Sequence, residues 1–267
     1  YAALNFTGPG APGWAIPMAT DIAFALGVLA LLGDRVPLSL KIFLAAFAVA
    51  DDIGAVTIIA LFYTAELNIT ALAAAAGLTG LLALLGRLRV RNLGVYLLFG
   101  AVLWLAVLKS GIHATLAGVI LALTIPQEDC GPQSPLIRLE HGLHPWVSWL
   151  VLPIFALANA GVTVAGGQMD PLDPIATGVA MGLLGGKLLG IPLMSWLAVR
   201  LGLAELPEGA GWIDIVGVGL LGGIGFTMSI FVAGLAFGDP VLLDTAKVGV
   251  LGGSLLAGSL GAGVLMW

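Results

Sequence analysis

Two adjacent carboxylates, Asp51 and Asp52, lie in the middle of an apolar run from Ile42 to Tyr63. The run is long enough to cross a bilayer as a helix, which takes about 20 residues. One ionised Asp at the centre of a membrane helix costs roughly 2.5 to 3.5 kcal/mol on insertion scales, so two in succession require a partner or a function. A carboxylate holds a small cation when it is ionised and a proton when it is neutral. Competition between the two at one site would produce exchange transport, with a purely structural buried pair as the alternative.

Two further ionisable residues lie inside apolar runs, Asp21 and Lys187. Three acids and one base predict that one Asp pairs with Lys187 and leaves acids that can change protonation. Asp51 and Asp52 lie about 100° apart around a helix axis, so they can address different neighbours. Lys187 is either a structural partner for an acid or a carrier of protons.

Oxygen ligands near these acids predict a site for Na⁺ or Li⁺. Thr20 and Thr227 add hydroxyl oxygens, and unwound backbone would add carbonyl oxygens. Hard cations prefer such ligands, whereas the sequence contains no thiolate or histidine cluster that indicates a transition metal. We therefore expect no cofactor beyond the transported ions.

The composition places these acids in a membrane. The sequence is 60% hydrophobic and 9% charged, with a mean hydropathy of +1.10, whereas an ordinary soluble domain is about 25% charged. The apolar runs are long and lack strand-like alternation, so we expect an all-α polytopic protein in the lipid bilayer. Nucleic-acid binding has no support. The single cysteine, Cys130, excludes an intrachain disulfide and is interpreted as a bystander thiol in a loop.

Hydropathy predicts about nine spans, and we expect residues 1–267 to form a single transmembrane domain, which the exchange chemistry above would make a transporter domain. The fourth and fifth spans are short and are separated by a turn at Lys109–Gly111. The polar connection that follows them contains Ser134–His144, which is predicted to be a surface segment with a short amphipathic turn. The predicted spans are 14–33, 38–63, 68–86, 92–109, 111–126, 146–166, 174–201, 212–237 and 241–267.

Positive charges orient these spans, because Lys and Arg near span ends favour the cytoplasm. The loops of one side carry seven such residues, and the other side carries two, Lys109 and Lys247. The C-terminus is therefore predicted to be cytoplasmic and Tyr1 to lie outside. An outside start without a signal peptide fits an odd number of helices missing upstream. The seven residues are Arg35, Lys41, Arg87, Arg89, Arg91, Arg138 and Arg200.

Two spans contain residues that weaken a continuous helix. Pro17, within Gly13–Asp21, cannot donate a backbone hydrogen bond. The three glycines of Gly222–Ser229 each lower helix stability by up to about 1 kcal/mol relative to Ala. Both segments are predicted to bend or unwind near the middle of the membrane, with kinking or close helix packing as the simpler interpretation.

Titratable residues near the span ends allow two interpretations. Glu140, His141 and His144 lie on the predicted cytoplasmic connection, where they are either solvated surface groups or a pH-responsive cluster. His113 is interpreted as a packing or interface residue near the outer membrane edge.

Six motifs, taken in order along the chain, closely resemble the NhaA-type sodium/proton antiporters. The match runs through essentially the whole sequence. The motifs are ATDIAFALGVLA (19–30), ADDIGA (50–55), VLKSGIHATLAG (107–118), RLEHGLHPW (138–146), the pair Gly186 and Lys187, and GIGFTMSIF (223–231).

The resemblance implies roles for these residues. Asp52 would be the main Na⁺-binding carboxylate, and Asp51 a second ion-site or gating acid that pairs with Lys187. Lys187 would also take part in proton exchange. Inverted repeats and unwound helices that cross are features of this family. Asp21 would compensate the positive helix ends at the crossing, which would include Thr20, Asp21, Gly223, Gly225 and Thr227.

The resemblance also implies electrogenic exchange of intracellular Na⁺ or Li⁺ for external H⁺ across a bacterial inner membrane, which regulates cytoplasmic pH and sodium. Glu140, His141 and His144 would belong to the region that responds to pH, and a homodimer is one expected assembly. The expected missing beginning would correspond to the first two helices and most of the third. The connection Gln127–Gln133 is more acidic than the family pattern.

A transporter of this kind would not be an enzyme. Two other interpretations remain open. A sodium-coupled symporter of an organic anion also uses broken helices, but it needs a place for the anion, and the core offers one Lys and three acids. A non-transporting structural or assembly subunit would tolerate neutralisation of Asp51 and Asp52 together.

Overall fold

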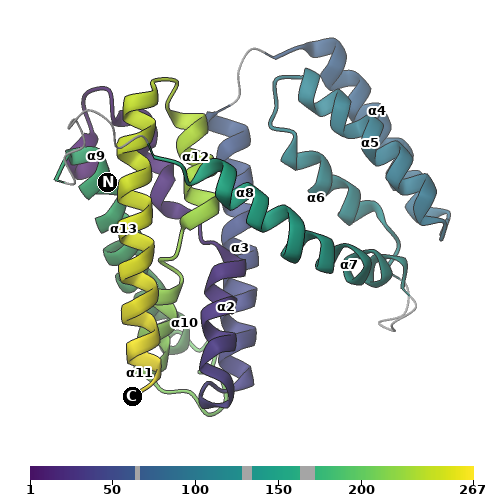
Figure 1. The fold of residues 1–267 in the computed structure, drawn as a ribbon. Helices are drawn as coiled ribbons and strands as arrows, with labels where there is room; N and C mark the ends of the chain where they lie inside the picture. Colours follow the sequence, from purple (N-terminus) through teal and green to yellow (C-terminus); the bar gives the residue numbers. More distant parts are fainter. Residues whose placement is uncertain (64–66, 128–133, 163–171) are drawn as a thin grey trace. The chain divides into compact units, whose positions relative to one another are not determined.

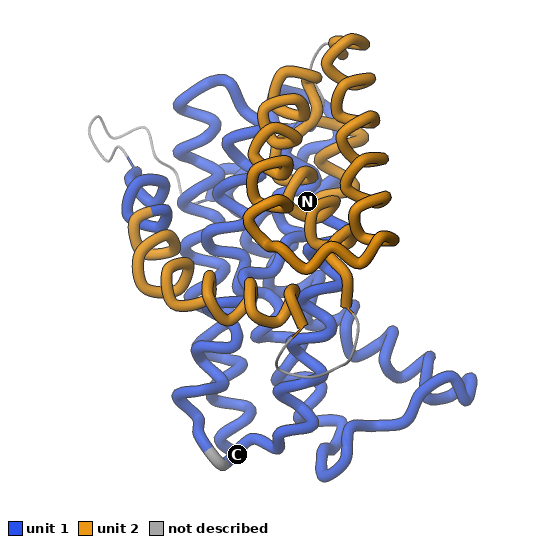
Figure 2. Tube along the Cα trace, turned by 90° about the vertical axis from the view of Figure 1, so that its right-hand side faces the viewer, with its two compact units in different colours: residues 1–55, 155–267 blue, residues 56–154 orange. Residues whose placement is uncertain are grey.

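The structure, a computed structural model, describes residues 1–63, 67–127, 134–162 and 172–267. Within those ranges every regular element is a helix (Figure 1). The chain forms two compact units, one of residues 1–55 and 155–267 and the other of residues 56–154 (Figure 2). Cys130 and most of the acidic connection around it lie outside the described residues.

The first unit packs around the long C-terminal helix α13, which lies against α9 and α11 (Figure 1). Helix α3 begins in this unit and continues into the second. The helices of the first unit are α1 (Ala2–Asn5), the 3₁₀ helix η1 (Ala11–Met18), α2 (Ile22–Leu32), η2 (Gly33–Arg35), α3 (Leu38–Phe62), α9 (Pro174–Met181), the π-turn η4 (Gly182–Gly186), α10 (Lys187–Arg200), α11 (Trp212–Leu221), α12 (Phe226–Ala236) and α13 (Pro240–Leu265).

One core of this unit joins α2, α3 and α11. Leu29, Leu40, Leu44 and Leu221 are almost completely buried there, beside Ile215. A fully buried Leu or Ile side chain contributes roughly 1.5 to 3 kcal/mol relative to an exposed one. This cluster therefore fixes the start of α3 against α2 and α11, and α3 carries Asp51 and Asp52.

The second unit contains three apolar helices with a core of its own, which includes Leu82, Tyr96 and Leu103. Asparagine side chains cap the N-terminal ends of two of these helices. Asn68 Oδ1 accepts hydrogen bonds from the amides of residues 70 and 71, and Asn92 Oδ1 accepts one from residue 94. The helices of this unit are α4 (Ile69–Arg87), α5 (Leu93–Lys109), α6 (Thr115–Thr124), α7 (Pro135–Trp146), the π-turn η3 (Val147–Val151) and the start of α8 (Leu152–Asn159).

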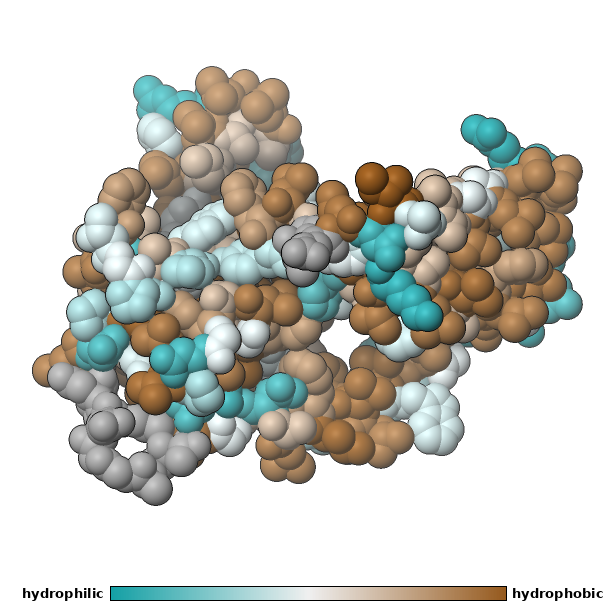
Figure 3. Space-filling model, turned by 90° about the horizontal axis from the view of Figure 1, so that it is seen from above, coloured by the Kyte–Doolittle hydropathy of each residue, from teal (hydrophilic) through white to brown (hydrophobic). Residues whose placement is uncertain are grey.

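The helices are apolar on their outward faces as well as inside. Leu31, Leu123 and Trp149 are each more than four-fifths exposed, and apolar side chains cover much of the surface in Figure 3. Among the described residues, six helices are long and apolar enough to cross a membrane, or seven if α11 and α12 form one broken span. These properties define a multi-pass membrane protein.

The count of nine spans stays a prediction, because α5 and α6 are shorter than the other candidates. Helix α6 has 10 residues, which extend about 15 Å at 1.5 Å per residue. The hydrocarbon core of a bilayer is about 30 Å thick, so a straight α6 covers only about half of it.

The prediction for Ser134–His144 is confirmed in part. Residues 136–144 are half-buried or exposed, as expected of a surface segment. The short turn is wrong, because the segment forms helix α7, which continues through η3 into α8, so one helical stretch runs from Pro135 to Asn159. Proline at the first helical position after Ser134 favours a start there. Pro145 does not end the helix; the helix continues past it, and the π-turn η3 begins two residues later. Residues 163–166 of the predicted span lie outside the described ranges.

Close packing of α13 on α9 depends on Gly249, where a Cβ atom would lie 2.8 Å from Ala176 Cα and 2.9 Å from Ala176 C. We expect Gly249→Ala to lower the free energy of unfolding by about 1 to 3 kcal/mol, because backbone atoms on α9 would have to move. The measurement is thermal unfolding in detergent. Gly252 lies on the same helix with nothing within 4 Å of its added Cβ, so Gly252→Ala should leave the stability unchanged or slightly raised. Equal effects of the two substitutions would contradict this packing.

Candidate functional site

Two membrane helices of the first unit are interrupted. The 3₁₀ helix η1 ends at Met18, Ala19 and Asp21 are extended, and α2 begins at Ile22. Helices α11 and α12 are separated by Gly222–Gly225 and bent by 47°. The interruptions follow the residues that weaken helices, because Pro17 lacks an amide hydrogen and glycine lowers helix stability.

Backbone groups released by the two interruptions bond to each other. The amide of Asp21 donates to the carbonyl of Ile224 at 2.6 Å, and Thr20 Oγ1 donates to the carbonyl of Gly222 at 2.7 Å. Such groups must find protein partners because the bilayer interior offers no water. At Gly223 a Cβ would lie 2.6 Å from the carbonyl oxygen of Leu183, so only glycine permits this close approach.

Asp21 joins the ends of two helices. Its Oδ1 accepts a hydrogen bond from the amide of Phe24 at 3.1 Å, which caps α2. Its Oδ2 accepts from the amide of Thr227 at 3.0 Å and also from Thr227 Oγ1. The residue is 2% exposed. One carboxylate therefore bonds to the positive N-terminal ends of both α2 and α12, where a negative charge is favourable.

Lys187 and Asp51 form an ion pair. Lys187 Nζ lies 2.7 Å from Asp51 Oδ2, and the two side chains are 11% and 14% exposed. Nζ also donates to Thr20 Oγ1 at 3.1 Å, which connects the pair to the interruption before α2. The π-turn η4 immediately precedes Lys187, and such turns occur often at functional sites.

Asp52 differs from its neighbour in its contacts. Its Oδ1 is buried and has no hydrogen-bond partner among the residues that the structure describes. A buried polar atom without a partner is costly. A proton or a small cation is the type of partner that a carboxylate oxygen accepts at such a place.

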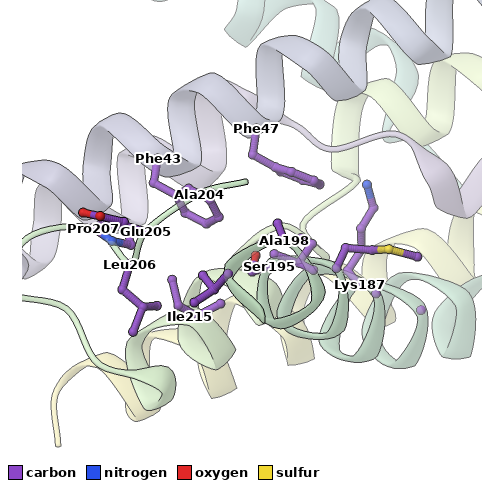
Figure 4. A pocket seen from close by; sticks show the side chains of 15 residues that line it. Phe43, Phe47, Lys187, Ser195, Ala198, Ala204, Glu205, Leu206, Pro207 and Ile215 are labelled. Atoms are coloured by element: carbon purple, nitrogen blue, oxygen red, sulfur yellow. The ribbon is translucent and has the colours of Figure 1, made fainter. Parts of the chain in front are cut away.

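A cavity of about 440 Å³ lies beside Lys187, between α3, α10 and the connection before α11 (Figure 4). Its wall is largely apolar. The side chains labelled in Figure 4 are Phe43, Phe47, Lys187, Ser195, Ala198, Ala204, Glu205, Leu206, Pro207 and Ile215.

The remaining sequence-predicted residues divide between the two units. Thr20, Asp21, Gly223, Gly225 and Thr227 all lie at the two interruptions in the first unit. Glu140, His141 and His144 lie on α7 in the second unit, where all three are exposed. His113 is also in the second unit, and its Nδ1 lies 3.2 Å from the hydroxyl of Thr115.

Sequence reasoning missed two residues of this region, Ser254 and Phe47. Ser254 Oγ on α13 accepts hydrogen bonds from the amides of Gly225 at 3.2 Å and Phe226 at 3.1 Å. Phe47 lies with its ring 5.3 Å from Lys187 Nζ. Neither residue stands out in the sequence, because small hydroxyls and phenylalanines are ordinary in apolar helices.

The fold and the site together define a class: a polytopic helical membrane protein with a buried lysine–aspartate pair beside two interrupted helices that bond to each other. The sequence model of the Na⁺/H⁺ antiporter 1 family matches residues 1–265. The chain belongs to this family, which is one of antiporters, and the resemblance found in the sequence is confirmed.

Bacterial relatives agree with this assignment. The chain is 59% identical over 265 residues to a Citrobacter koseri protein, and the alignment covers 98% of this chain and 68% of the relative. It is 58% identical, with the same coverage, to proteins of Salmonella typhimurium and Escherichia coli O139:H28. All three are named Na(+)/H(+) antiporter NhaA.

Neutralising Asp21 should destabilise the protein. In Asp21→Asn an amide group replaces one of the two acceptor oxygens that serve Phe24 and Thr227, and the negative charge is lost. Hydrogen bonds to charged groups are worth about 1.5 to 3 kcal/mol, so we expect a loss of about that size in thermal unfolding in detergent.

The matched control for Asp21→Asn is Asp239→Asn. Asp239 is exposed and caps α13 through the amide of Val241 at 2.9 Å. Asn caps a helix about as well as Asp, so Asp239→Asn should leave stability nearly unchanged. A similar small effect at both positions would contradict the role of Asp21 at the two interruptions.

Proposed function

We propose that this protein exchanges intracellular Na⁺ or Li⁺ for external H⁺ across the bacterial inner membrane. The observation that carries the proposal is a buried oxygen of Asp52 that has no partner among the described residues, next to the Asp51–Lys187 ion pair. Membership of an antiporter family and the names of the relatives support the same activity. We propose no resident cofactor, and we propose a transporter rather than an enzyme.

In this mechanism Asp52 holds either the cation or a proton, so the binding of one displaces the other. Asp51 adds a second carboxylate when the cation binds, and Lys187 then loses the partner that it has at 2.7 Å. Exchange becomes electrogenic when more protons enter than Na⁺ ions leave. The membrane potential then drives Na⁺ out of the cell, and this exchange regulates the pH and the Na⁺ concentration of the cytoplasm.

Alternating access would occur around the two interrupted helices, within one transporter domain. We propose that these helices are the unwound crossing of an inverted-repeat fold with about nine spans in this chain. Their released backbone groups bond to each other and to Asp21, so the interruption can persist in lipid. We further propose a cytoplasmic C-terminus and a homodimer in the bilayer.

The pH response would arise from the exposed residues Glu140, His141 and His144 on α7. Histidine changes charge near neutral pH, so a cluster of this kind can report cytoplasmic pH. This assignment rests on the family resemblance of the RLEHGLHPW motif and on the exposure of the three side chains.

The alternative of an organic-anion symporter is not favoured. The described core of the site holds one Lys, and that Lys is paired with Asp51. A structural subunit remains testable, because it would keep its function when Asp51 and Asp52 are both neutralised.

Asp52→Asn should abolish exchange, because an amide cannot bind and release the proton and binds a cation weakly. The measurement is the Na⁺-induced collapse of a preformed pH gradient in everted membrane vesicles. It compares this chain, a version fused to the part of the Citrobacter koseri relative that lies outside the alignment, and the active version carrying Asp52→Asn. The variant should fall to the response of vesicles without the protein.

The control in this assay is Asp239→Asn, which should keep the wild-type response because Asp239 is an exposed helix cap. Normal Na⁺-driven proton movement in a folded Asp52→Asn variant would overturn the proposed function.

A further inference from the structure

Phe47 contacts Lys187 in addition to the two hydrogen bonds that Lys187 donates. Phe47 and Asp51 are four residues apart on α3, so they lie on one face of the helix. The ring centroid of Phe47 is 5.3 Å from Lys187 Nζ, and Figure 4 shows the ring extending from α3 toward Lys187. An ammonium within about 6 Å of a ring centroid is attracted by the negative face of the ring.

Among the described residues, Lys187 Nζ has three favourable contacts, as many as it has N–H donors. An ammonium has three N–H groups and accepts no hydrogen bond. Asp51 Oδ2 and Thr20 Oγ1 take two of them, at 2.7 Å and 3.1 Å. The residue is only 9% exposed, so little water reaches it. Within the described part of the chain, the Phe47 ring is therefore the third favourable contact of this cation.

One of these contacts has to change during exchange. If Asp51 becomes a ligand of Na⁺, Lys187 loses its ionised partner while it remains buried, and an unpaired buried charge is costly. Thr20 cannot replace the lost carboxylate, because its hydroxyl is neutral and already accepts a hydrogen bond from Lys187 Nζ. The ring of Phe47 carries no exchangeable group, so it stays beside the ammonium, and its attraction for the ammonium is stronger once the Asp51 carboxylate no longer balances that charge.

We propose that Phe47 is a positioning residue that holds the Lys187 ammonium when Asp51 is occupied by Na⁺. The inference rests on the proposed function and deepens it. The ring stabilises the Na⁺-bound state more than the Na⁺-free state, because only in the former does Lys187 lack its carboxylate. Phe47 thereby sets the apparent affinity for Na⁺ without touching the ion.

A simple packing role for Phe47 makes a different prediction. Phe47 is half-buried and lines the cavity of about 440 Å³, so a side chain of similar volume would fill the same space. The attraction for a cation depends on the electron density of the ring face, whereas packing depends on volume. Fluorine atoms on the ring withdraw that electron density and change the volume little.

The test replaces Phe47 by para-fluorophenylalanine, by a trifluorinated phenylalanine, by Leu and by Tyr in the version of the protein that is active in vesicles. Initial rates of Na⁺-dependent H⁺ movement give KM for Na⁺ and Vmax. We expect KM to rise stepwise with fluorination and by about fivefold in Phe47→Leu, with Vmax within about twofold of wild type. Phe47→Tyr should keep the wild-type KM.

Phe43→Leu is the matched control, because Phe43 lines the same cavity one helical turn earlier on α3. Its KM should equal that of the wild type. Equal KM values for Phe, trifluorinated Phe and Leu at position 47, in a wild type that exchanges Na⁺ for H⁺, would overturn the role of Phe47 alone. Absence of Na⁺-dependent exchange in every version of the unsubstituted protein would overturn the proposed function, and this inference with it.

Discussion

The burial of a lysine ammonium and an aspartate carboxylate 2.7 Å apart is the interaction on which the rest of this structure depends. Removing either partner leaves an uncompensated charge, which typically costs about 3 to 5 kcal/mol in a protein interior. The pair therefore bonds α10 to α3, two helices that line opposite parts of one cavity. The same cost makes the pair responsive, because any ion that competes for Asp51 changes the balance of free energy that holds these helices.

The interrupted helices satisfy a second constraint, which is that backbone polar groups in a membrane must bond to protein. Asp21 accepts hydrogen bonds from the N-terminal ends of α2 and α12, and Thr20 donates one to the carbonyl of Gly222. Ser254 accepts from the two amides at the start of α12. Thr20 also accepts from Lys187. The ion pair and the interruptions are thus one hydrogen-bonded network, so a change in the ionic contacts of Lys187 reaches the unwound backbone directly.

Asp51 and Asp52 are neighbours in sequence with different surroundings. Asp51 is bonded to Lys187, whereas one oxygen of Asp52 is buried without a partner in the described part of the chain. Two carboxylates in different environments can take different roles, one held by a counter-charge and one available to a proton or cation. Phe47 adds to this division, since its ring gives Lys187 a contact that remains when Asp51 binds a cation instead of the ammonium, and that then carries more weight.

Much of this protein is determined by its sequence alone. Long apolar runs predict membrane helices, and the cost of burying charge singles out Asp51, Asp52 and Lys187. Pro17 and the glycines after Leu221 predict where helices are interrupted. Each of these effects acts locally along the chain, so the sequence is enough to predict it. The helical stretch from Pro135 was not predicted, since Pro145 within it indicated a helix boundary, whereas in the structure the helix continues past Pro145. The residue pattern left open which acid Lys187 meets, and the tertiary structure shows Asp51, 136 positions away, as the family resemblance implied. Only the tertiary structure decided that Thr20 reaches Gly222 across 202 positions and that one oxygen of Asp52 lacks a partner among the described residues. Such contacts depend on how helices pack in three dimensions, and neither hydropathy nor spacing along one helix encodes them.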